Sequence, residues 1–155
     1  MAAIAPFSIR AIERADRAQW EPLWQGYNAF YGRAGDTALD AEIVGATWHR
    51  FFDDDEPVHA LVAHHGDQLL GIVHFMYHRA TIRIEPVCYL ADLFTAPAAR
   101  GQGVGKALIE AVYQHARFCQ VSYVYWRTGE GNETARRLYN RVAQYSGSVV
   151  YHQFV

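Results

Sequence analysis

The stretch 90–109 joins an apolar strand, a glycine-rich turn and the first residues of an amphipathic helix. Gly101, Gly103 and Gly105 stand at alternate positions in the turn, so no side chains cover a run of backbone N–H groups. The run lies where a helix is expected to begin, and there the unpaired amides and the helix dipole both favour an anion. The pattern therefore predicts a binding site for a pyrophosphate group.

Two well-known phosphate-binding turns fit this segment less well. A Walker A loop ends in Gly-Lys followed by Ser or Thr, but Ala107 follows Gly105-Lys106, and Arg100 stands at the position of the first glycine. A Rossmann turn needs a third glycine where this chain has Lys106 or Leu108. A structural turn without a ligand is the remaining alternative. It is disfavoured because each glycine costs roughly 0.5–1 kcal/mol against alanine in a helix or strand interior.

A second motif follows a predicted strand near the end of the chain. Asn132, Ala135, Leu138 and Tyr139 form the pattern N-x-x-A-x-x-L-Y on a predicted helix at 132–143. Asn132 is placed to cap this helix or to hydrogen-bond a ligand. Tyr139 lies seven residues later, two turns along, on the same helix face. The alternative for this pair is a simple N-cap and a core aromatic residue.

Hydrophobic periodicity predicts the elements that position these motifs, in the order β-α-α-β-β-β-α-β-α-β. We expect strands at 7–12, 58–64, 68–77, 86–95, 121–127 and 148–154. We expect helices at 17–31, 40–52, 103–118 and 132–143, with Asp16 as the N-cap of the first. This order indicates an α/β fold with a central mixed, mostly antiparallel sheet and flanking helices.

The two motifs together resemble the GCN5-related N-acetyltransferase (GNAT) superfamily, and the predicted element order is similar to the GNAT fold over nearly the whole chain. The segment 100–105 matches the Q/R-x-x-G-x-G/A loop of that superfamily, and the segment 132–139 is similar to its second cofactor element. The resemblance is greatest to the branch with fungal histone, polyamine and D-amino-acid acetyltransferases and their bacterial relatives. Many family members end in two strands, whereas this chain leaves room for one, which is a candidate for pairing with another subunit.

The resemblance implies an N-acetyltransferase that moves the acetyl group of acetyl-coenzyme A to a primary amine by direct attack in a ternary complex. The acceptor would be a small amine, an amino acid, a polyamine, or a lysine or N-terminal amine of a peptide. A homodimer is also implied. A non-catalytic sensor of acyl-coenzyme A is the second hypothesis, and transfer of a longer acyl group is a third.

The resemblance also implies roles for individual residues. The hydroxyl of Tyr139 would protonate the departing thiolate, and Asp92 is the second catalytic candidate. Tyr27, Tyr31 and Tyr89 are candidates for lining the acceptor site. The implied cofactor-binding residues are Leu93, Phe94, Thr95, Arg100, Gly101, Gln102, Gly103, Val104, Gly105, Lys106 and Asn132.

The general base is less clear than the general acid. Polyamine acetyltransferases of similar sequence carry Glu where this chain has Ala91. Strand alternation places Ala91 on one face with Tyr89 and Leu93, and Asp92 on the other. Asp92 is then either catalytic or a buried structural carboxylate. In a further alternative, the proton of the amine leaves through water, with Tyr89 or a distant acid as the relay.

Composition and charge exclude several other classes of protein. A length of 155 residues, half of them apolar, is typical of a single domain, 1–155. The net charge of −2 and the lack of a basic stripe argue against nucleic acid, and no apolar run approaches the ~20 residues that cross a membrane. Cys88 and Cys119 are expected to be buried free thiols, and no metal site is expected. The first residues do not have the features of a signal peptide, so we expect a cytoplasmic protein.

Overall fold

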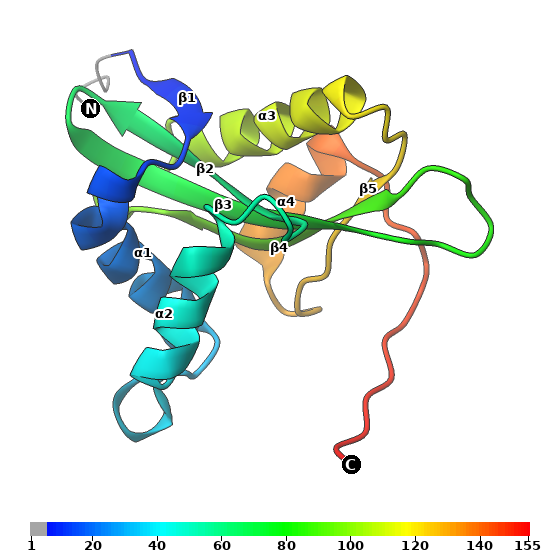
Figure 1. Cartoon of the computed structure of the whole chain (residues 1–155), viewed down its shortest axis with the longest axis horizontal. Helices are drawn as coiled ribbons and strands as arrows, with labels where there is room; N and C mark the ends of the chain where they lie inside the picture. The colour runs from blue at the N-terminus through cyan, green and yellow to red at the C-terminus, as the bar shows by residue number, and fades with distance from the viewer. Residues whose placement is uncertain (1–5) are drawn as a thin grey trace.

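The computed structural model describes residues 6–155, which form a mixed five-stranded sheet with helices on both faces (Figure 1). The N-terminal stretch 1–5, with which the predicted domain begins, lies outside the described residues. The strands are β1 (Ser8–Ala11), β2 (Val58–His65), β3 (Gln68–His78), β4 (Val87–Thr95) and β5 (Val124–Tyr125). The helices are α1 (Arg17–Phe30), α2 (Ala41–Arg50), α3 (Val104–Phe118) and α4 (Glu133–Val142). Among the described residues, no helix is both long and apolar enough to span a bilayer.

The strands lie in the sheet in chain order, and every neighbouring pair is antiparallel except the parallel pair β4–β5. The predicted α/β class with a mixed, mostly antiparallel sheet is therefore confirmed. Helix α3 covers one face of the sheet, and α1 and α2 cover the other (Figure 1). Each face has its own hydrophobic core. Leu108, Ile109 and Val112 of α3 fill one, and Trp20 and Trp48 are buried at the centre of the other.

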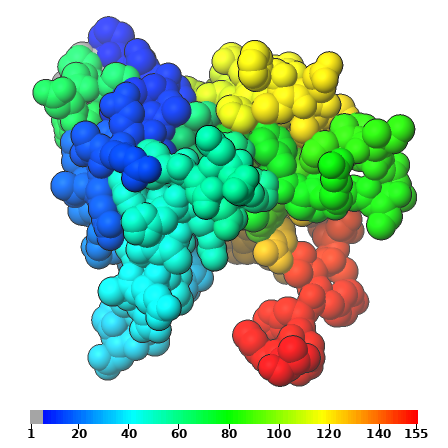
Figure 2. Space-filling view, in the orientation of Figure 1, coloured from blue at the N-terminus to red at the C-terminus, as the bar shows by residue number. Residues whose placement is uncertain are grey.

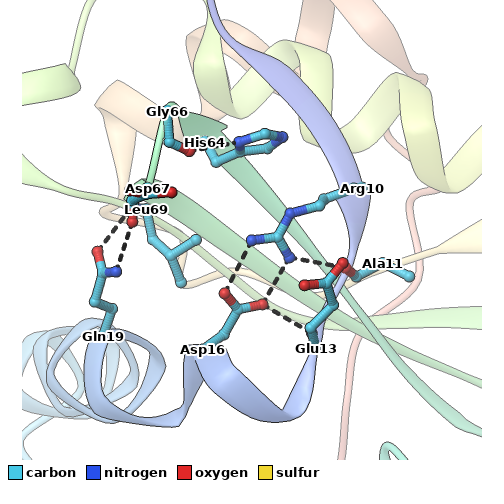
Figure 3. Close-up of polar contacts among 9 residues, drawn as sticks. All are labelled: Arg10, Ala11, Glu13, Asp16, Gln19, His64, Gly66, Asp67 and Leu69. Carbon is cyan, nitrogen blue, oxygen red and sulfur yellow. Dashed lines mark hydrogen bonds and ion pairs between the residues drawn. The ribbon is translucent and has the colours of Figure 1, made fainter.

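An ion pair with a buried carboxylate fixes the connection between β1 and α1 (Figure 3). Both nitrogens of the Arg10 guanidinium fork donate to Asp16, at 2.7 and 2.9 Å, and the N–H of Glu13 donates to the same carboxylate at 2.8 Å. Asp16 therefore closes the short 3-10 turn Arg14–Asp16 and makes no capping bond to α1. Asp16 thus occupies the predicted N-cap position of α1, but its side chain does not cap the helix, because the carboxylate is turned toward Arg10.

Strand β4 carries a β-bulge that changes which side chains share a face. His74 of β3 pairs with Asp92, but the next residue, Phe75, pairs with Leu90, so Ala91 has no partner of its own. An extra residue in one strand shifts the alternation of all the residues beyond it. The bulge thus reverses the outward and inward positions in the second half of β4.

The predicted faces of β4 are wrong as a result. Leu90 and Leu93 both pack in the core under α3, whereas Phe94 packs under α1 and the Asp92 carboxylate bonds to a residue of α1. Tyr89, the neighbour of Leu90, lies on the α1 face. Asp92 and Tyr89 therefore share a face, which strict alternation would not allow.

Two predicted strands also differ from the structure. The strand expected at 121–127 is reduced to the two residues of β5, because it pairs with β4 only there. The strand expected at 148–154 is absent: residues 143–155 form no sheet pairing, and this segment leaves the body of the protein (Figures 1 and 2). A strand needs a neighbour for its N–H and C=O groups, and the segment runs past no edge of its own sheet. Of the two cysteines, Cys88 is buried as expected, but Cys119 at the end of α3 is exposed.

The Arg10–Asp16 pair gives a test of the fold. Replacing Arg10 with alanine should lower the free energy of unfolding at pH 7 by about 1–3 kcal/mol, because Asp16 is only 6% exposed and would lose a bidentate partner. The hydrogen bond from Arg10 lowers the pKa of Asp16, so this stabilisation is present above the unfolded pKa of about 3.9 and is lost as the pH falls through the folded value.

Urea denaturation of the wild type and of Arg10→Ala at pH 7 measures the difference in free energy of unfolding. The same measurement at low pH should show a smaller difference. The matched control is Arg137→Ala, which breaks an ion pair with Glu133 whose side chains are 75% and 80% exposed and should cost less than about 0.5 kcal/mol. Equal effects of the two substitutions at pH 7 would contradict the assignment.

Candidate active site

Strands β4 and β5 pair over only two residues and then separate. Cys88 pairs with Val124 and Tyr89 with Tyr125, whereas on its other edge β4 stays paired with β3 as far as Thr95. Among residues 6–155 no strand pairs with the β5-facing edge of β4 beyond Tyr89. This edge presents main-chain groups to an extended ligand.

The glycine-rich loop lies directly after this edge. Gly101 and Gly103 have φ angles of +74° and +85°, in the left-handed region that favours glycine. Helix α3 begins at Val104, and its first intrahelical bond runs from the Ala107 N–H to the Gly103 carbonyl, 3.0 Å away. The N–H groups of the first turn therefore have no acceptor within the helix and face outward at its positive end.

The loop is held against the end of β4. The side chain of Arg100 donates from Nε to the Thr95 carbonyl at 3.2 Å and lies 5.4 Å from the Phe94 ring centroid. Gln102 donates to the Ala98 carbonyl at 3.3 Å, and Lys106 forms an exposed ion pair with Glu110. The structure thus brings the predicted cofactor-binding residues of β4 and of the loop into one continuous segment.

Gly105 lies where α3 faces α4 and the end of β4, with room for a Cβ atom in ordinary van der Waals contact. A Cβ atom at this position would lie 3.4 Å from a methyl group of Leu138 and 3.8 Å from the hydroxyl of Thr95. Asn132 stands at the start of α4, where its amide donates to the Thr128 hydroxyl at 3.0 Å and makes no capping bond to the helix. Asn132 therefore occupies the N-cap position of α4, as one alternative for it predicts, but its side chain does not cap the helix.

Tyr139 of α4 is half-buried against Trp126, with 5.3 Å between the ring centroids. Burial raises the pKa of Tyr139 to about 12, and Tyr31 near the end of α1 adds to this effect. The hydroxyl therefore keeps its proton throughout the physiological range. Tyr139 can donate a hydrogen bond or a proton to an anion that forms beside it.

The three tyrosines predicted for the acceptor site lie around the bulge in β4. The hydroxyl of Tyr27 donates to the carbonyl of Ala91, the bulged residue, at 3.2 Å, and its ring lies 5.0 Å from that of Tyr31. The hydroxyl of Tyr89 accepts a hydrogen bond from Nε of Arg127 at 3.0 Å. Sequence analysis missed Arg127. The only sequence signal for it is that it stands two residues after Tyr125, so strand alternation would place both side chains on one face.

Asp92 is at the end of a buried chain of hydrogen bonds. The indole N–H of Trp20 donates to Nε2 of His74 at 2.9 Å, and Nδ1 of His74 lies 2.8 Å from the Asp92 carboxylate. Because an indole can only donate, Nε2 carries no proton, and the His74 ring is neutral with its proton on Nδ1. The contact between His74 and Asp92 is therefore a hydrogen bond to a carboxylate and not an ion pair.

The same carboxylate accepts a second bond from the Trp24 indole at 3.1 Å. Burial on its own would raise the pKa of Asp92, but the hydrogen bonds from His74 and Trp24 outweigh it and lower the pKa below its ordinary value. Asp92 is thus an ionised group. Its side chain is 20% exposed, so water reaches it.

A model of the Acetyltransferase (GNAT) family matches residues 16–143. The chain belongs to this family. It is 32% identical over 145 residues to the D-amino-acid N-acetyltransferase HPA3 of Saccharomyces cerevisiae, an alignment that covers 92% of this chain and 88% of the yeast protein. It is 26% identical over 134 residues to the uncharacterized N-acetyltransferase YhfO of Bacillus subtilis, covering 86% and 87% of the two chains.

Solved acetyltransferase structures share the fold. The ribosomal-protein-alanine N-acetyltransferase of Brucella melitensis biovar Abortus 2308 matches with a TM-score of 0.77 at 21% identity, over 97% of this chain and all of that one. AAC(6')-Iy bound to the bisubstrate analogue CoA-S-monomethyl-acetylneamine matches with a TM-score of 0.80 at 15% identity, over 97% and 99% of the two chains. As a GNAT acetyltransferase, the protein is an enzyme that uses acetyl-coenzyme A, as its sequence predicts. Family membership does not favour the alternative of a non-catalytic sensor.

The residues present in this GNAT acetyltransferase fit the cofactor. Two left-handed glycines and the N-terminus of α3 suit a pyrophosphate, and the unpaired edge of β4 suits the amide-containing pantetheine arm. Helix α1 packs closely on β4 and supports this edge of the strand. A Cβ atom on Gly26 of α1 would lie 2.6 Å from the Phe94 ring, so the glycine lets α1 pack directly on β4.

The loop can be tested with the cofactor alone. Replacing Gly103 with alanine should weaken binding of acetyl-coenzyme A by roughly 10- to 100-fold, because the φ of +85° is strained for alanine and one or two hydrogen bonds to a charged ligand would be lost. Saturation of the wild type at 100 times Kd should raise its stability by about 2.7 kcal/mol, which thermal melts detect.

Gly45→Ala in α2 is the matched control for this substitution. A Cβ atom there meets nothing within 4 Å, so the variant should keep both its fold and the full cofactor-induced shift. A Gly103→Ala protein that keeps the wild-type shift would show that the loop does not bind the pyrophosphate.

Proposed function

We propose that the protein is an N-acetyltransferase that transfers the acetyl group of acetyl-coenzyme A to a primary amine by direct attack in a ternary complex. The observation that carries this proposal is the unpaired edge of β4, which has the glycine-rich loop at its end and the tyrosines of the α1 face beside its bulge. A donor and an acceptor bound there would approach the same stretch of main chain. The yeast relative, named as a D-amino-acid N-acetyltransferase, supports an amine acceptor.

The proposed roles in holding the cofactor follow from the same geometry. The loop amides between Gly101 and Lys106 would bind the pyrophosphate, Leu93 to Thr95 would pair with the pantetheine arm, and Asn132 would bond to that arm from α4. When bound, acetyl-coenzyme A supplies the acetyl group as a thioester, whose C–S bond breaks as the new N–C bond forms. One proton must then leave the amine nitrogen and one must reach the sulfur.

We propose that Tyr139 is the group that interacts with the sulfur of the departing thiolate. An ordinary thiol has a pKa of about 8.5, whereas that of Tyr139 is about 12, so complete proton transfer from Oη is uphill. The main contribution of Tyr139 is therefore a hydrogen bond from Oη that stabilises the negative charge as it develops. Such a bond to a charged group is worth roughly 1.5–3 kcal/mol.

Asp92 is proposed to receive the proton of the amine through water. Its lowered pKa makes it a weak base, but a weak base suffices because a free amine with a pKa near 10 is already ~0.1–1% neutral at pH 7–8. The neutral His74 ring and Trp24 hold the carboxylate in place with two donors. Ala91 contributes only its carbonyl, which anchors Tyr27.

A Tyr139→Phe variant tests the proposed mechanism. We expect kcat to fall by about 10- to 100-fold with an unchanged Kd for acetyl-coenzyme A, because the ring still packs on Trp126 while the hydrogen bond is lost. Free-thiol release with a panel of amines gives kcat, and calorimetry gives Kd. Since the pKa of Tyr139 is about 12 and the protonated form is the active one, the wild type should show no fall in kcat up to about pH 10. An equal loss of cofactor affinity would assign Tyr139 a structural role instead.

We further infer that the C-terminal segment 143–155 pairs with a second copy of the chain. This segment leaves the body of the protein (Figure 2). Its Tyr151 and Phe154 side chains are 91% and 87% exposed. Large side chains that are accessible to this degree and follow one another along an extended segment are typical of an interaction site. The proposed homodimer would cover them.

The double substitution Tyr151→Asp and Phe154→Asp should convert the dimer to a monomer in analytical ultracentrifugation, because charges cannot be buried without partners. The control is Phe118→Asp at the end of α3, where a single apolar side chain on another element is exposed to a similar degree, at 89%. The control should stay dimeric. A wild type that is monomeric at 100 times the assay concentration would show that the inference is wrong.

A further inference from the structure

Arg127 stands at the point where β5 leaves β4, on the face of the sheet that carries Tyr89. Its Nε donates to the Tyr89 hydroxyl at 3.0 Å, and its guanidinium lies 5.4 Å from the centroid of that ring. The hydrogen bond that Arg127 donates to this tyrosine raises the pKa of Arg127, and Tyr27 on α1 contributes in the same direction. The contacts with Tyr89 place the guanidinium beside β4, at the point where β5 separates from it.

The fork of this guanidinium meets no carboxylate in the described part of the chain. Among residues 6–155 no carboxylate lies within 4.0 Å of Arg127, and its side chain bonds to Tyr89 through Nε alone. Two terminal nitrogens that point away from a fixed Nε are the arrangement that binds a carboxylate through two parallel hydrogen bonds.

The space beside Arg127 also contains the proposed catalytic tyrosine. A cavity of about 810 Å³ between β5, α4 and the C-terminal segment is lined by both Arg127 and Tyr139. Its other charged lining residues are Arg83, Arg136 and Glu130, and Arg83 is paired with Glu85 outside the lining. The cavity therefore carries more positive than negative charge, which attracts an anion and repels a polycation.

We propose that Arg127 binds the carboxylate of the acceptor and thereby makes this enzyme selective for free amino acids over simple amines and polyamines. The inference rests on the proposed function, since it names the class of amine that the same site takes. An α-carboxylate held by Arg127 beside Tyr89 would lie on the face of the sheet to which Asp92 also points. Tyr89 acts as a positioning residue, because it fixes the orientation of the guanidinium without itself contacting the carboxylate.

Three acceptors that differ only at the carboxylate test the proposal: leucine in both enantiomers, leucinamide and 3-methylbutylamine. The wild type should acetylate one enantiomer of leucine with a kcat/KM about 10- to 100-fold above those of the other two compounds. In Arg127→Gln this preference should shrink to within about 3-fold, because kcat/KM for leucine falls while kcat/KM for 3-methylbutylamine does not fall. Arg127→Lys should keep part of the preference, because it retains the charge and loses the fork.

Two further variants separate a specific role from a general loss of charge. Arg117→Gln, on α3 and outside the cavity lining, should behave as the wild type. Tyr89→Phe removes the hydroxyl that holds Arg127 and should reduce the preference less than Arg127→Gln does. A preference that is unchanged in Arg127→Gln would overturn the proposal, as would an Arg127→Gln protein whose main defect is weaker binding of acetyl-coenzyme A.

A binding measurement gives the same test without turnover. In the presence of coenzyme A, calorimetric titration with N-acetylleucine should show tighter binding to the wild type than titration with N-acetylleucinamide, and Arg127→Gln should remove the difference. A wild type that acetylates all three amines equally well and binds the two products equally would refute the role of Arg127 and leave the proposed function intact. A wild type that acetylates no amine would refute the proposed function, and the titration would then decide the role of Arg127 alone.

Discussion

The site depends on one constraint, which is that β4 must be a firmly held strand on one edge and an unpaired strand on the other. Pairing with β3 along its whole length supplies the rigidity, while β5 pairs with β4 over only two residues. Unpaired main-chain groups in a folded protein need water or a ligand as partner. The candidate active site is therefore a gap in the hydrogen-bonding pattern of the sheet, and the α3 N-terminus at the end of β4 extends the same unpaired main chain by another turn.

The bulge at Ala91 determines which side chains face this gap. Without it, Asp92 would point into the core under α3, where an ionised carboxylate would have no donors. With it, Asp92 reaches the α1 face and meets Trp24 and His74, and His74 is itself fixed by Trp20. Four polar groups in a nearly dry core are then all satisfied, which holds the carboxylate in one position. The aromatic residues of the α1 core thus serve the site as well as the stability of the fold.

The sequence alone identifies the parts of the site that act through main chain and spacing. Left-handed positions at Gly101 and Gly103 need glycine, and the helix that follows is strongly amphipathic, so the loop is visible as a pattern. The bulge leaves no such trace, because any residue can occupy it and only the pairing with β3 reveals it. The alternating pattern at 148–154 predicts a final strand. A strand also needs a neighbouring strand to pair with, and the sequence of the segment itself does not show whether one is present. Arg127 escapes sequence analysis for a similar reason, since its role arises from Tyr89, 38 residues away.

The two halves of the site share one electrostatic character. The donor side attracts anions through backbone amides and the α3 dipole, and the acceptor side carries Arg127 and Arg136 without carboxylate partners among the described residues. A polyamine would bring several positive charges next to these guanidiniums, with only Asp92 and Glu130 to offset them. An amino acid brings one charge of each sign, and in the proposed complex its carboxylate would pair with Arg127 and its ammonium with Asp92. Charge balance at the acceptor side therefore favours a zwitterion, although the fold by itself would accept many amines.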